Sequence, residues 1–147
     1  MRRRKRYRGA VCVMGKFQTA LRVEKESEHS WKLLEPLVYN SDTIGLIVVD
    51  AGFVTNFASV PRLPLMYWAF GGVGDEAATL HDWLYRKDHT QSTGHERVID
   101  RETADKVLRG VIIECLTKDG TSKLKANLIA WAMWAGVRIG GASHWEK

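Results

Sequence analysis

The chain has 147 residues, 45% of them hydrophobic and 27% charged, so it can bury the core of one domain and is too apolar to be intrinsically disordered. Its net charge of +5 comes from six basic residues among the first eight, which leave 16 basic against 17 acidic side chains elsewhere. This distribution excludes a basic surface over the whole domain. No apolar run approaches the ~20 residues that cross a bilayer.

We expect residues 1–9 to form a flexible basic arm, followed by a single α+β domain over residues 10–147. Such an arm can contact nucleic acid or acidic lipid headgroups, or it can be a solvated tail that aids solubility. No apolar segment follows the basic start, so no signal peptide is expected. The basic residues of the arm are Arg2, Arg3, Arg4, Lys5, Arg6 and Arg8.

The first half of the domain has the patterns of short strands. Residues 10–14 are a short apolar run, and residues 17–23 alternate between apolar and polar side chains. A polar turn follows, and Pro36 restricts the apolar residues 31–39 to an edge strand or a bend. Residues 44–49 are rich in β-branched side chains, which predicts a central strand.

The second half has the patterns of three helices. The first is expected over residues 76–86 with Asp75 as its N-cap, and the second after an Asp100 N-cap, ending at Asp119 and Gly120. The third begins at Thr121 or Ser122 and has an apolar face composed of Leu124, Leu128, Trp131, Trp134 and Ala135. The predicted fold class is α+β, with N-terminal antiparallel strands followed by three packed helices.

Polar groups with catalytic potential line one edge of the first predicted helix. His81 and Asp82 are neighbours, and Tyr85 lies one turn after His81 on the same face. On the second helix, Asp105 follows the apolar position Ala104 and can reach a nitrogen of His81 if the two helices pack together. A carboxylate on one imidazole nitrogen makes the other nitrogen a better base. The simpler interpretation is a packed histidine that is bonded to a neighbouring group.

The segment 52–62 is a second candidate, because it mixes glycine, proline and small polar side chains after a predicted strand. Loops of this composition line pockets. Its predicted pocket residues are Thr55, Asn56, Ser59 and Arg62. The alternative is a structural turn whose polar side chains bond their own backbone.

Taken in order, GFVTNFASVPR (52–62), LHDWLY (80–85) and DRETADKVL (100–108) resemble domain of unknown function 1353, a family of small phage and prophage proteins. The resemblance runs from about Trp31 to the third helix. It implies a phage-related origin, and therefore a place in the host cytoplasm or in the virion, with a virion protein as a further partner for the arm. The family usually has Asp where this chain has Asn56, which argues against an essential carboxylate at that position.

The His-Asp-x-x-Tyr helix also resembles, at four positions, that of the secreted phospholipase A2 enzymes. This resemblance implies that His81 activates water, that Asp82 binds calcium, and that Asp105 orients His81 with support from Tyr85. The chain lacks the disulfides and the clear calcium loop of those enzymes. It also lacks HExxH and CxxC motifs, so calcium is a better candidate than zinc for a divalent cofactor.

The leading hypothesis is a phage hydrolase that acts on an ester or amide bond of the host envelope. His81, Asp105 and Tyr85 would be its catalytic group, and Asp82 a cation ligand. A second hypothesis is a non-catalytic virion or accessory protein in which these residues form a buried polar network and the basic arm contacts DNA or a partner. A third is an anti-host protein that binds a ligand or a host protein without turnover.

Overall fold

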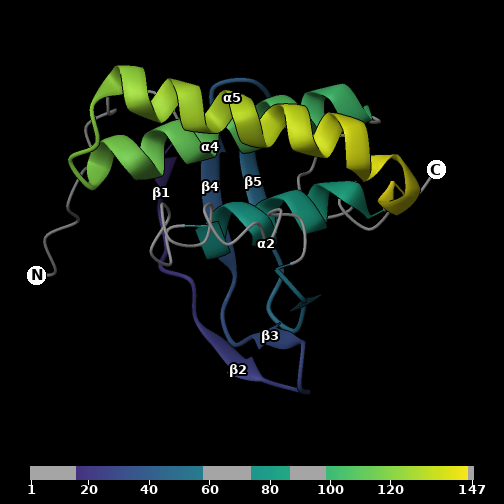
Figure 1. Ribbon diagram of the computed structural model, residues 1–147. Helices are drawn as coiled ribbons and strands as arrows, with labels where there is room; N and C mark the ends of the chain where they lie inside the picture. The colour runs from purple at the N-terminus through teal and green to yellow at the C-terminus, as the bar shows by residue number, and fades with distance from the viewer. Residues whose placement is uncertain (1–15, 58–73, 87–98, 146–147) are drawn as a thin grey trace, which may run out of the picture.

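The computed structural model describes residues 16–57, 74–86 and 99–145. In these residues, antiparallel strands in two small sheets precede three α-helices, which confirms the predicted α+β class (Figure 1). The strands are β1 (Lys16–Phe17), β2 (Val23–Lys25), β3 (Trp31–Leu33), β4 (Leu37–Ser41), β5 (Gly45–Val49) and β6 (Val54–Thr55). The helices are α2 (Gly74–Tyr85), α4 (Arg101–Lys118) and α5 (Lys123–Gly140), followed by the 3-10 helix η1 (Gly141–His144).

The two sheets have the orders β1-β4-β5 and β2-β3-β6. The hairpin β4–β5 pairs Leu37 with Val49 and closes at Gly45, whose φ of 82° favours glycine. We expected the segment that contains β5 to form a central strand, but within the described chain β5 is an edge strand and β4 is central. The strand expected over residues 10–14 lies outside the described residues.

The alternating segment 17–23 does not form one strand, which corrects the prediction. Its two ends, β1 and β2, belong to different sheets. Between them, the Thr19 hydroxyl accepts a hydrogen bond from the Val38 backbone N–H at 2.8 Å and donates one to the Pro36 carbonyl at 3.0 Å. A side chain thus bonds backbone groups beside Pro36, which separates β3 from β4 as the predicted bend.

The helix ends largely follow the predicted capping residues. Asp100 accepts a hydrogen bond from the Thr103 backbone N–H at 2.7 Å at the start of α4, and Ser122 caps α5. Helix α4 ends before Asp119, and Gly120 has a φ of 87°. Asp75 is not an N-cap, because α2 already includes Gly74. None of the described helices combines the length and hydropathy that a membrane span requires.

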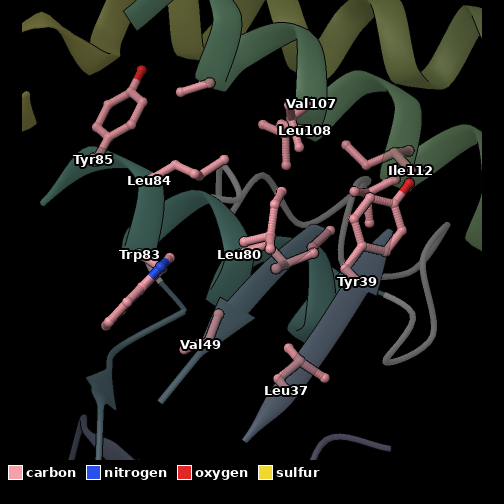
Figure 2. Packing of buried hydrophobic residues seen from close by; sticks show 14 of the residues in the cluster. Leu37, Tyr39, Val49, Leu80, Trp83, Leu84, Tyr85, Val107, Leu108 and Ile112 are labelled. Atoms are coloured by element: carbon pink, nitrogen blue, oxygen red, sulfur yellow. The ribbon is translucent and has the colours of Figure 1, made fainter. Parts of the chain in front are cut away.

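The core lies between α2, α4 and the β4–β5 hairpin. Figure 2 shows Leu80 of α2 between the sheet residues and the residues of α4. The buried side chains labelled there include Leu37, Val49, Leu84, Val107, Leu108 and Ile112. Because α2 and α4 share this core, polar residues at its margin come close to each other.

Helix α5 packs on α4 through small and medium side chains rather than through its largest ones. Its buried residues are Ala126, Ala130, Met133 and Val137. The apolar face expected from the sequence points away from this contact, and Leu124, Leu128 and Trp131 on it are exposed. The physical reason is that small residues let α5 approach α4 closely.

Candidate functional site

His81 and Asp105 form a buried pair between α2 and α4. The His81 Nε2 atom lies 2.8 Å from Asp105 Oδ1, and the two side chains are 2% and 0% exposed. His81 comes to the margin of the core because it is next to Leu80 on α2, and Asp105 because it is next to Ala104 on α4. The structure therefore brings together the two residues that the sequence analysis paired.

Two further side chains hold Asp105 in place. The Tyr85 hydroxyl donates to Oδ1 at 2.5 Å, and Arg138 of α5 donates from Nη1 to Oδ2 at 3.0 Å. The ring of Tyr85 also packs against that of His81, with centroids 4.0 Å apart. Asp105 thus links residues of all three described α-helices through one carboxylate.

The carboxylate of Asp105 is ionised. Burial alone would raise the pKa of Asp105, but the hydrogen bonds from His81, Tyr85 and Arg138 outweigh burial and hold the pKa below its usual range. An ionised carboxylate can only accept hydrogen bonds, so His81 Nε2 must carry the proton that it shares with Asp105. In the neutral ring, Nδ1 is then the atom with the lone pair.

The Nδ1 atom of His81 is buried and has no hydrogen-bond partner among the described residues. A buried ring nitrogen without a partner costs free energy, so it calls for a functional or structural explanation. Its lone pair can accept a proton from a water molecule or a hydroxyl, which is what a general base needs.

Asp82 points to a different part of the molecule. Its Oδ2 accepts a 2.6 Å hydrogen bond from the hydroxyl of Thr55, which is buried at the end of β6. This contact joins the 52–62 segment to α2, so two segments singled out from the sequence meet here. The Thr55 hydroxyl also accepts a hydrogen bond from the backbone N–H of Phe57, whose φ of 53° is unusual for a non-glycine residue.

Of the remaining predicted site residues, the structure describes only Asn56. Asn56 is exposed. Ser59 and Arg62 lie outside the described residues, as do all the basic residues of the predicted arm over 1–9. Among the described residues, no group of three or more His, Cys, Asp or Glu side chains is arranged to hold a metal ion.

Three residues of the site were missed by the sequence analysis. Arg101 lies one turn before Asp105, and its Nη2 donates to the backbone carbonyl oxygens of Val137 and Arg138 at 2.8 and 2.6 Å. Arg138 is the one cation in the C-terminal half of α5, which could have suggested a buried partner. Trp145 follows η1 and packs edge-on against Tyr85 with a centroid distance of 5.1 Å.

Because Gly141 has no side chain, the Tyr85 hydroxyl can lie close to its backbone. A Cβ atom at Gly141 would lie 2.9 Å from the Tyr85 hydroxyl oxygen, whereas one at the adjacent Gly140 would meet nothing within 4 Å. We expect Gly141→Ala to reduce the free energy of unfolding by about 1–2 kcal/mol through overpacking. Gly140→Ala, the matched control, should be neutral or stabilising by about 0.5 kcal/mol. Urea denaturation measures both, and equal values would contradict the predicted contact.

Burial and the hydrogen bond to Asp105 raise the pKa of Tyr85 to about 12. The unfolded-state pKa is about 10, so this stabilisation is fully present below pH 10 and is lost as the pH rises through 12. We expect Tyr85→Phe to cost about 1.5–3 kcal/mol at neutral pH. The difference from the native protein should shrink between pH 10 and 12 in denaturation curves. The pKa of Tyr39 is also raised by burial, but Tyr39 is present in both proteins, so its effect on stability cancels in the difference between them. A difference that is independent of pH would contradict this assignment.

No curated protein and no solved structure matches the chain. One family model, described as a protein of unknown function (DUF1353), matches residues 31–137. This range includes β3, the contacts of His81 and Tyr85 with Asp105 and the Thr55–Asp82 contact, and it ends one residue before Arg138. The match covers well over half of the sequence, and the chain therefore belongs to the DUF1353 family.

Proposed function

We propose that this protein is a small hydrolase in which His81 acts as the general base. One observation carries the proposal: the buried imidazole of His81 donates from Nε2 to an ionised carboxylate, while Nδ1 has no hydrogen-bond partner among the described residues. This arrangement fixes the tautomer and directs the basic lone pair away from Asp105.

The proposed reaction is the attack of water on the carbonyl carbon of an ester or amide. Nδ1 of His81 removes a proton from the water as its oxygen bonds to the carbon, and the same proton passes to the leaving alcohol or amine when the old bond breaks. Asp105 stabilises the positive charge that the ring carries between these steps. Tyr85 and Arg138 act through Asp105, so they are positioning residues.

Asp82 is the proposed ligand for a divalent cation, with calcium favoured because carboxylate oxygen is a hard ligand. The hydrogen bond from Thr55 fixes the orientation of this carboxylate. The described residues contain no group of three or more His, Cys, Asp or Glu side chains that could hold a metal ion, so we assign no step of the reaction to a cation.

The resemblance of the site segments to phage proteins supports a target in the host envelope, and a place in the host cytoplasm or virion. The predicted pocket residues Thr55, Asn56, Ser59 and Arg62 would contact the substrate in this proposal. Thr55 is buried and its hydroxyl already bonds Asp82 and the Phe57 backbone N–H, so in this proposal it shapes the pocket by holding the Asp82 carboxylate.

A second candidate function is supported by the same network. Asp105 joins residues of α2, α4 and α5, as expected if its main role is to hold the three helices together. The protein would then be a non-catalytic virion or accessory protein, and its predicted basic arm would contact DNA or a partner.

The purified protein tests the two candidates. A soluble p-nitrophenyl ester and phospholipid vesicles serve as the substrates, with and without calcium, and His81→Gln is compared with the native protein. The hydrolase proposal expects product release that depends on His81. No hydrolysis of either substrate by a folded native protein, with a lower melting temperature for His81→Gln, would favour the structural role.

A further inference from the structure

Helix α5 has two apolar faces, and only one of them is packed. The four buried residues that contact α4 recur at spacings of four, three and four residues. The opposite face carries large apolar side chains that are strongly exposed: Leu124 at 84%, Leu128 at 67%, Trp131 at 53% and Ile139 at 86%. In Figure 1, α5 lies on the outer side of α4, away from the sheets.

This outer face is continuous along the helix. Positions 124, 128, 131, 135 and 139 follow one another at intervals of three or four residues, and all five are apolar. A helix that packs on its own domain through one face is normally polar on the other. Large exposed apolar patches on soluble proteins mark interaction surfaces. The outer face of α5 is therefore expected to bury these side chains against a partner.

The charges on α5 select the kind of partner. The helix has no acidic residue, and it carries Lys123 and Lys125 in its first turn and Arg138 near its end. The guanidinium of Arg138 already pairs with Asp105, which leaves the two lysines to face a partner. Before the helix, the positive charge of Lys118 and the negative charge of Asp119 cancel. A second copy of this chain would bring basic residues next to basic residues, because neither a parallel nor an antiparallel arrangement supplies an acidic side chain from α5. An anionic lipid surface complements both the apolar face and the two lysines at its start.

We propose that the outer face of α5 binds an anionic bilayer surface, with the helix lying in the plane of the interface. The 18-residue helix is about 27 Å long, and it does not meet the criteria for a membrane span. Leu124, Leu128 and Ile139 enter the boundary between headgroups and acyl chains, and Trp131 lies at headgroup level, where indole is favoured. This inference does not depend on hydrolase activity.

Co-sedimentation of the full chain with vesicles tests the proposal. We expect binding to vesicles that contain phosphatidylglycerol and phosphatidylcholine, much weaker binding to phosphatidylcholine alone, and weakening by salt. Leu128→Gln should reduce the affinity roughly tenfold or more, since a leucine side chain no longer enters the lipid. Leu34→Gln is the matched control and should bind like the native protein. Leu34 is 53% exposed and directly follows β3, which lies at the opposite end of the molecule from α5 in Figure 1.

The predicted basic arm could bind anionic vesicles by itself, but it is identical in the native chain and in Leu128→Gln. Equal binding by these two proteins would therefore show that α5 does not dock and would overturn the proposal. Absence of binding to the anionic vesicles would also overturn it. Sedimentation velocity without lipid gives a third outcome: a dimer that Leu128→Gln dissociates would show that a second copy covers the face.

Discussion

Replacement of Asp105 by Asn should destabilise the protein more than any other single exchange of a polar side chain in the site. Asp105 accepts hydrogen bonds from His81 and Tyr85 on one oxygen and from Arg138 on the other. The amide of Asn keeps the shape but loses the charge, and it presents an N–H₂ group to one set of donors. Breaking a buried charged pair costs about 3 kcal/mol or more, which lowers the melting temperature by roughly 6–12 °C in a domain of this size.

The same variant should alter the response to acid. The pKa of Asp105 in the folded protein lies below its unfolded value, so its stabilisation is present above pH ~4 and is lost as the pH falls through the lower folded value. The difference between the native protein and Asp105→Asn should therefore be largest near neutral pH and should shrink below pH ~4.

Glu102→Gln is the matched control for Asp105→Asn on the same helix. Glu102 pairs with Lys106 at the exposed surface of α4, where one salt bridge contributes less than about 1 kcal/mol. Thermal denaturation across pH 3–7 measures both variants. Equal melting temperatures for the two variants would show that the Asp105 network does not stabilise the fold.

The second large effect is expected on activity, at His81. In His81→Gln, the amide N–H₂ can still donate to Asp105, but no basic ring nitrogen is left. If His81 is the general base, the rate of ester hydrolysis should fall by about 10²–10⁴-fold. The melting temperature should fall less than in Asp105→Asn, because the carboxylate keeps a donor.

His29→Gln is the control for a histidine exchange in itself, since His29 is exposed in the turn between β2 and β3. Its hydrolysis rate should equal that of the native protein. Initial rates with the p-nitrophenyl ester at several pH values give the comparison. A His81→Gln protein with the native rate would rule out His81 as the base, whatever its stability.

The pairing of His81 with Asp105 could be predicted from the sequence because both residues flank core positions on amphipathic helices. A side chain that follows Leu80 or Ala104 lies at the edge of the contact between the two helices, because these two residues are buried in it. The capping of α4 by Asp100 and of α5 by Ser122 was predictable for a similar reason, since capping depends on residues within one turn.

The roles of Arg138 and Trp145 could not be predicted in this way. Arg138 is 33 residues from Asp105, and Trp145 meets Tyr85 across 60 positions of sequence. Such contacts depend on how α5 and η1 pack against α2 and α4, which no local pattern encodes. The split of segment 17–23 between two sheets has the same origin, because the Thr19 side chain bonds backbone groups 17 and 19 residues away.

By itself, the sequence determined the α+β class, the ends of α4 and α5 and the two carboxylates near His81, because each depends on periodicity or on neighbours within a turn. Only the tertiary structure decided which face of α5 is buried. Both of its faces are apolar, so hydrophobic periodicity could not choose between them. Close packing on α4 selected the face of small residues, and it left Leu124, Leu128, Trp131 and Ile139 exposed.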